Sequence, residues 1–227
     1  MEVQNRVYHE NLSIDNNVFR SFLIENATYS GHLELPCITT SSKLPNRIIP
    51  FSKAMSKNRN DFDCWVAFYE YDRKFERLWH NPRQYLPRLQ KFNGIISPDF
   101  SLYRNMPLVM QAWNTYRGRA LAAWLQSNGL EIIPNVRYND ERTYDFCFDG
   151  IEKNKSVAVG THGCLKTKED ILYFKLGLAV MVNRLMPKNI IVYGAAPDRI
   201  FQPYRNMGIN ILVFESEFAK TRKQVTA

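Results

Sequence analysis

The sequence predicts an α/β protein in which about six mostly parallel strands alternate with helices. Two observations support this class. Apolar runs of four to six residues recur between positions 61 and 218, and most of the stretches between them carry helix-capping residues or apolar residues at helical spacing. The runs are apolar almost throughout, which is typical of parallel strands covered on both faces. Such strands form an open doubly wound sheet or an incomplete barrel, and the pattern does not separate these two architectures.

The first predicted strand is residues 65–69, which are rich in aromatic side chains. Asp72 is placed to cap the helix that follows, and Pro82 stands near the start of a second helical stretch that ends at Phe92. Residues 94–97 form the second predicted strand.

A long helix is predicted next, with Asn105 as its capping residue and Gly129 as the left-handed residue that ends it. Residues 131–136 form the third predicted strand, and Pro134 indicates a bulge or an early strand end there. The apolar face predicted for the long helix consists of Val109, Trp113, Tyr116, Ala120 and Trp124.

A polar segment, residues 138–155, leads to the fourth predicted strand at 156–159. Thr167 and Asp170 then form the T-x-x-D pattern of a capping box, and Pro187 ends the helix that they begin.

The fifth predicted strand is residues 189–192. A short helix begins at Pro197, is cut or bent by Pro203 and closes at Gly208. Residues 209–214 form the sixth strand.

A chain of 227 residues is long enough for one domain with a sizeable core. We expect residues 1–60 to be an irregular N-terminal extension packed on the core, residues 61–218 to be the α/β domain and residues 219–227 to be a frayed polar tail. The N-terminus lacks the apolar stretch of a secretory signal, no run is long enough to span a membrane, and the four cysteines form no CxxC pair. We therefore expect a cytoplasmic protein without a membrane partner.

The positive charge is concentrated in one segment. The whole chain has a net charge of +8, and residues 43–91 carry eleven bases and five acids, which is +6 of that total. Aromatic residues are interleaved with these bases, and such a mixture can neutralise phosphates and stack nucleobases. A solvated helix surface above core aromatic residues accounts for the same pattern. The candidate nucleic-acid-binding residues are Lys53, Lys57, Arg59, Arg73, Lys74 and Arg77.

Ligands of both parallel architectures bind beyond the carboxyl ends of the strands. The candidate catalytic residues at these positions are Asp99 and Glu215, as a base or as ligands of a divalent ion, and His162, as an acid–base group. Each of these two residues also has an explanation without a function: Asp99 can stabilise a turn, and His162 can be a hydrogen-bonded loop residue. The candidate phosphate-binding or ligand-binding residues are Asn135, Arg137, Thr161 and Tyr193.

The sequence identifies no cofactor. It contains no GxxxxGK[ST], GxGxxG, HExxH or GxSxG motif. Oxygen ligands such as those of Asp99 favour Mg²⁺ or Mn²⁺ if a metal takes part.

Several segments resemble an uncharacterised family, a domain of unknown function found on phages, plasmids and integrative elements, mostly of Gram-positive bacteria. The resemblance covers about residues 45–215 and is most specific in SPDFSLY (97–103), NTYRGRA (114–120), IPNVR (133–137) and GTHG (160–163). It implies a mobile-element context and no established reaction.

Three hypotheses remain. The first is a nucleic-acid-associated protein of a phage or other mobile element, which serves replication, maintenance or control. The second is an enzyme or receptor for a nucleotide or another phosphate ester, with its site at the strand ends. The third is a factor that binds a host protein. The sequence does not decide whether the protein is an enzyme.

Overall fold

The computed structural model describes residues 20–217 and residue 219, and within them seven parallel strands form two sheets. The first sheet contains β3 (Ile48–Pro50), β4 (Trp65–Ala67), β5 (Gly94–Ile96) and β6 (Ile132–Ile133). The second contains β7 (Ser156–Gly160), β8 (Asn189–Tyr193) and β9 (Asn210–Phe214). All six predicted strands are confirmed, as β4 to β9. The expectations for residues 1–19 and for the tail from residue 220 onward lie outside the described residues.

The strands follow chain order in both sheets, β3-β4-β5-β6 and β7-β8-β9, and every pair within them is parallel. Neither sheet has the reversal of strand order found in a doubly wound sheet, and the sheets do not close into a barrel. One parallel bridge, between Asn135 and Ala158, joins β6 to β7 across the gap between the sheets. Two backbone hydrogen bonds of 2.8 Å form this bridge: the N–H of Val136 donates to the Ala158 carbonyl, and the N–H of Ala158 donates to the Pro134 carbonyl.

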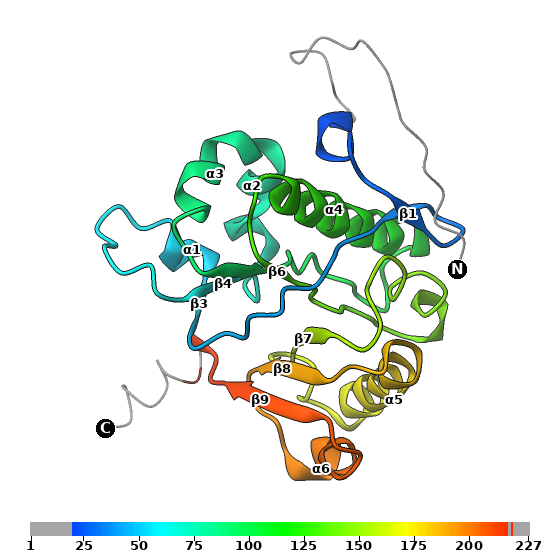
Figure 1. Cartoon of the computed structure of the whole chain (residues 1–227). Helices are drawn as coiled ribbons and strands as arrows, with labels where there is room; N and C mark the ends of the chain where they lie inside the picture. Colours follow the sequence, from blue (N-terminus) through cyan, green and yellow to red (C-terminus); the bar gives the residue numbers. More distant parts are fainter. Residues whose placement is uncertain (1–19, 218, 220–227) are drawn as a thin grey trace.

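Helices connect the parallel strands and lie outside the sheets (Figure 1). Around the first sheet are α1 (Phe51–Ala54), α2 (Glu76–His80), α3 (Pro82–Leu89) and α4 (Leu108–Ser127). Beside the second sheet are α5 (Lys168–Leu185) and α6 (Asp198–Asn206). The short elements are η2 (Ser21–Leu23), η3 (Asp72–Lys74), η4 (Glu141–Thr143) and the antiparallel pair β1 (Tyr29–Ser30) and β2 (Leu35–Pro36).

Both faces of β3 to β8 are largely buried, as the apolar runs predicted, whereas the edge strand β9 is partly exposed, with Val213 at 49%. Neighbouring residues of a strand alternate between faces, so Trp65 and Val66 of β4 belong to different clusters. Side chains from all seven parallel strands meet on one face in an inner cluster. The inner cluster consists of Ile48, Trp65, Ala67, Tyr69, Ile96, Ile133, Ala158, Ile191 and Tyr193, with Leu212 and Phe214 packed against it.

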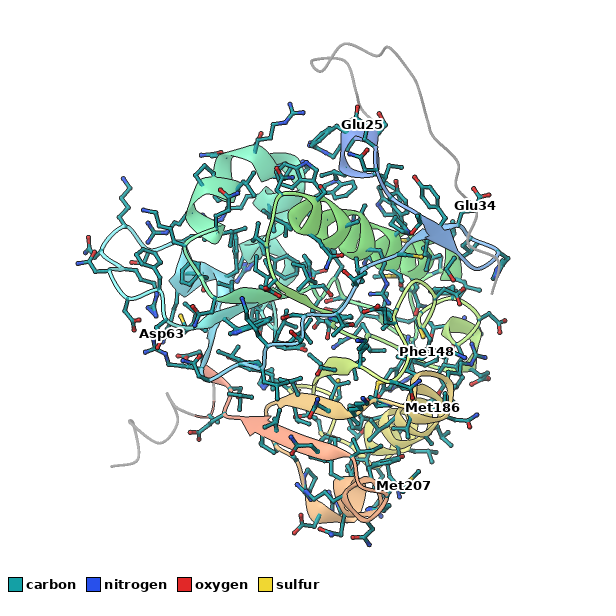
Figure 2. All side chains as sticks on the ribbon, viewed as in Figure 1. Glu25, Glu34, Asp63, Phe148, Met186 and Met207 are labelled. Atoms are coloured by element: carbon teal, nitrogen blue, oxygen red, sulfur yellow. The ribbon has the colours of Figure 1, made fainter. Side chains whose placement is uncertain are left out.

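The predicted ends of α5 are confirmed, but Asp72 is not a helix cap: it lies inside η3 and accepts from Ser101. Thr167 and Asp170 form a reciprocal capping box at the start of α5. Met186 ends α5 in the left-handed conformation, with φ 48°, just before Pro187. Figure 2 shows the exposed side chains of Met186 and Met207 at the ends of α5 and α6.

The long helix α4 differs from its prediction. It begins after Pro107, and Asn105 does not cap it. Val109 and Trp113, expected on the core face, are 75% and 47% exposed, whereas Gln111 and Asn114 are buried. Polar side chains are buried here because they hold neighbouring loops. Gln111 accepts a bond from Asn139, and Asn114 donates to the carbonyl of Ser101 at 2.7 Å.

The strand β3 was not predicted, because residues 1–60 were expected to be irregular. The run is short and includes Pro50, a residue that normally argues against a strand. Pro50 fits there because β3 is an edge strand, where the missing N–H removes no ladder bond. Within the described residues, no helix combines the length and the apolar character that crossing a membrane requires.

Arg119 of α4 is 4% exposed and holds the segment between the two sheets. Its guanidinium donates to the backbone carbonyls of Cys147 at 2.9 Å, Asp149 at 3.3 Å and Asn135 at 3.4 Å. Burial lowers the pKa of Arg119 to about 10, so the group still carries its charge at neutral pH. Buried carbonyls that lose such a donor destabilise a fold.

We expect Arg119→Met to lower the free energy of unfolding by about 3 kcal/mol, because the buried carbonyls lose a charged donor. Urea denaturation followed by circular dichroism measures the change. Arg199→Met, on the exposed surface of α6, is the matched control and should change stability by less than about 0.5 kcal/mol. Equal midpoints for the two variants would contradict a holding role for Arg119.

Candidate functional site

A cavity of about 550 Å³ opens at the carboxyl ends of four neighbouring strands. The segments that follow β4, β5, β6 and β7 form its walls, together with the start of α5. Three predicted site residues, Asp99, Arg137 and His162, line this one cavity. The complete lining is Tyr69–Tyr71, Asp99, Ser101–Asn105, Arg137–Asn139, Gly160, His162–Cys164, Lys166, Asp170, Tyr173 and Phe174.

A buried chain of hydrogen bonds orients Asp99. The Tyr69 hydroxyl donates to Oδ1 of Asn135 at 2.9 Å, and Nδ2 of Asn135 donates to Oδ1 of Asp99 at 2.7 Å. The amide of Asn135 has one accepting and one donating end, so these two bonds together fix which way it faces. Asn135 is therefore not part of the cavity lining. It contributes to the site by orienting Asp99, which is.

Arg137 pairs with the other oxygen of Asp99, with Nη1 at 3.5 Å from Oδ2. Burial raises the pKa of the Asp99 carboxyl above its usual range, while the charge of Arg137 and the Asn135 amide act in the opposite direction. The charge of Asp99 in turn raises the pKa of Arg137, so the guanidinium stays protonated. The cavity thus contains an oriented carboxyl and a fixed cation side by side.

His162 lies in the turn between β7 and α5, next to Gly163, which has φ +84°. Such a backbone angle favours glycine, which explains why the turn carries it. Burial, followed by the charge of Lys166, lowers the pKa of His162 below 6.5. The imidazole is therefore neutral at pH 7 and can accept as well as donate a hydrogen bond.

Aromatic rings form much of the remaining wall. Tyr138 packs between the rings of Phe148 and Phe174, and its hydroxyl donates to the Phe174 carbonyl at 3.2 Å. The guanidinium of Arg104 lies over the Tyr173 ring at 4.9 Å and pairs with Asp170 at 3.0 Å. The wall of the cavity thus combines aromatic side chains with polar groups.

The other strand-end candidates lie elsewhere. Thr161 is buried between residues of the lining, and its hydroxyl has no hydrogen-bond partner. Tyr193 belongs to the inner cluster, where it stacks on Tyr69 with 5.0 Å between ring centroids, and its hydroxyl accepts a bond from the N–H of Glu217. Glu215 is exposed and is not among the cavity residues, so it does not meet Asp99 there.

Two of the candidate nucleic-acid-binding lysines form ion pairs. Lys53 contacts Glu217, and Lys74 lies 3.4 Å from Glu70. Lys57 is exposed on the loop after α1.

The three candidate arginines contact side chains of their own segment. Arg59 lies against the sulfur of Cys64, Arg77 lies over the rings of Phe51 and Tyr85, and Arg73 lies over the Tyr71 ring at 5.7 Å. Most aromatic residues of this basic segment are buried in the core. This is the arrangement expected if the bases form a solvated surface above core aromatic residues. Tyr71, 61% exposed, is the clear exception.

No three side chains of His, Cys, Asp or Glu in the described part of the chain are grouped as a metal ion would require. The carboxylates nearest the cavity are engaged by protein donors: Asp72 accepts two bonds from Ser101, and Glu70 accepts from Ser52. The roles of Asp99 and Glu215 as a base or as ligands of Mg²⁺ or Mn²⁺ stay predictions, and the two carboxylates do not line the same cavity.

The sequence-based search missed the aromatic part of the cavity. The candidates were polar or ionisable side chains at the strand ends, such as Asn135 and Tyr193. The tyrosines Tyr71, Tyr103 and Tyr138, in the segments that follow the strands, were not among them. The family resemblance could have indicated two of these tyrosines, because Tyr103 ends the SPDFSLY segment and Tyr138 follows IPNVR.

Comparison with known proteins agrees with the resemblance found in the sequence. A family model described as a domain of unknown function, DUF4417, matches residues 27–215, and the chain belongs to this family. No solved structure matches.

Two curated relatives are phage proteins, each called "Gene 1 protein". Those of Mycobacterium phage D29 and Mycobacterium phage L5 are both 39% identical to this chain over 129 residues, or 57% of its length. The match spans 48% of the D29 protein and 56% of the L5 protein, so the chain covers about half the length of these relatives.

We expect the pKa of His162 to lie below 6.5 and to rise toward that value in Lys166→Gln, because the variant removes a neighbouring positive charge. The folded protein then binds this proton less readily than the unfolded chain, so stability falls as the pH drops below about 6.5. Titration of the imidazole proton signals by NMR measures the pKa, with His162→Gln to assign the signal. Lys155→Gln, before β7, is the control, and an equal rise in that variant would exclude a specific effect of Lys166.

Proposed function

We propose that this protein is a nucleic-acid-associated protein of a phage or other mobile element that binds a nucleotide, or another phosphate ester, in the cavity at the strand ends. One observation carries the proposal: Asp99, Arg137 and His162 come from three different loops and line a single cavity with aromatic walls. The phage relatives support the mobile-element context. The volume of about 550 Å³ lies in the range of small-molecule sites.

The two sides of the cavity suit the two ends of a nucleotide. The half-buried Tyr173 offers a ring against which a base can pack, and Tyr138 and Phe174 form the apolar wall beside it. In the turn between β7 and α5, His162 and Lys166 line the cavity, where they can donate hydrogen bonds to a phosphate and Lys166 adds a positive charge. We assign the base to the rings and the phosphate to the turn that contains His162.

Arg137 and Asp99 suit the middle of such a ligand. A guanidinium held in place by a carboxylate loses little entropy on binding and presents a planar set of donors. The Asp99 carboxyl can accept from a hydroxyl or an amino group. The same pair offers acid–base chemistry as well as recognition, because a neutral imidazole and an oriented carboxyl face one cavity.

We expect nucleoside monophosphates to raise the melting temperature of the protein. A ligand at 100 times its Kd stabilises the folded state by about 2.7 kcal/mol, which corresponds to several degrees for a chain of this size. Differential scanning fluorimetry with the common ribonucleotides and deoxyribonucleotides, with and without Mg²⁺ or Mn²⁺, measures the shift.

Titration calorimetry then assigns the phosphate end. His162→Gln and Lys166→Gln should each weaken binding about tenfold, or about 1.4 kcal/mol, and Lys155→Gln should bind like the unsubstituted protein. The proposal fails if no nucleotide shifts the melting temperature, or if the three variants bind equally well.

A further inference from the structure

We propose that the ligand of the cavity is the end of a single-stranded nucleic acid, whose terminal nucleotide enters the cavity while the next nucleotides lie on Tyr71, Arg73 and Tyr103 at its mouth. The inference rests on the proposed function and specifies its substrate class. It connects the basic segment and the strand-end cavity, which otherwise have no common role.

The first argument is the exposure of two rings. Tyr71 and Tyr103 border the cavity but are 61% and 55% exposed, whereas Tyr69, two residues before Tyr71, is 8% exposed. A ring that closes around a mononucleotide would be covered by the walls of the cavity. Rings that remain in solvent at the mouth offer stacking faces to bases outside it.

The second argument is the position of these rings. Tyr71 follows β4 and Tyr103 follows β5, and β4 and β5 are paired neighbours, with Trp65 opposite Gly94. Both rings therefore belong to one side of the mouth. A strand that leaves the cavity on that side meets them in succession.

The third argument is the charge beside them. The guanidinium of Arg73 is exposed and lies 5.7 Å from the centroid of the Tyr71 ring. A cation next to a stacking ring matches the repeat of a single strand, in which each base is followed by a phosphate. Lys74 contributes less, because Glu70 already pairs with it.

The depth of the cavity excludes an intact duplex end. Asp99 is 8% exposed and Tyr69 is buried beside it, so a base that reaches them has left its partner strand. The outer bases must also be unstacked from a complementary strand to lie on the tyrosine rings. The geometry therefore favours single strands, of DNA or RNA.

Fluorescence anisotropy with 3′-labelled and 5′-labelled oligonucleotides of one to eight nucleotides, DNA and RNA, tests the inference. We expect affinity to rise at least tenfold between one and three nucleotides, because stacking contributes about 1–3 kcal/mol per base, and to become salt-dependent. A blunt duplex of the same sequence should bind no better than the mononucleotide.

Substitutions identify the surface responsible. Tyr71→Ala, Tyr103→Ala and Arg73→Gln should each reduce the ratio of oligonucleotide to mononucleotide affinity at least threefold. Tyr71→Phe, which keeps the ring, should preserve the ratio, and Arg199→Gln on α6 is the charge control. Unchanged melting temperatures establish that the variants fold.

The outcomes separate the two proposals. Mononucleotide binding with no gain from added nucleotides overturns the inference and leaves the proposed function standing. Duplex binding as tight as single-strand binding, or a ratio that Tyr71→Ala leaves unchanged, also overturns it. Absence of binding to mononucleotides and oligonucleotides alike overturns both.

Discussion

Asn135 is the residue on which the two sheets and the cavity both depend. Its backbone pairs with Ala158 and so joins the sheets, and its N–H donates to the Ser97 hydroxyl at 2.8 Å. Its side chain sets the orientation of Asp99. The backbone and the side-chain amide of Asn135 are buried, so each of their polar atoms needs a hydrogen-bond partner. An unpaired polar atom at this depth destabilises the fold. The same residue therefore fixes both the position of the site and the junction between the two sheets.

The four segments that carried the family resemblance meet in this region. Segments 97–103 and 133–137 supply Asp99 and Asn135, and the 114–120 segment supplies Arg119, which donates to the Asn135 carbonyl. The 160–163 segment forms the turn with His162. Gly118 lets α4 approach the first of these segments closely, because a Cβ there would lie 3.0 Å from the Pro98 carbonyl oxygen. The most specific parts of the sequence thus encode a single buried network and the cavity above it.

The sequence predicted the strands and the capping box of α5 well, because apolar runs and capping residues are local signals. It failed for the buried face of α4, where polar side chains such as Gln111 are buried only because loops from elsewhere supply their partners. The rule that ligands bind at strand ends predicted the location of the cavity. It selected Asp99 and His162, and both line the same cavity. The same rule selected Glu215, although the end of the edge strand β9 does not reach the cavity. Which strand ends share a wall depends on tertiary packing that no local pattern contains.

The sequential strand order has a consequence for how the chain folds. Each parallel strand pairs with the strand that precedes or follows it in the chain, so successive units can assemble without bringing distant segments together. The contact between Lys53 and Glu217 differs, because these residues are 164 positions apart and follow the first and last parallel strands. We expect this contact to form after the transition state, so that its loss would speed unfolding and leave the folding rate unchanged.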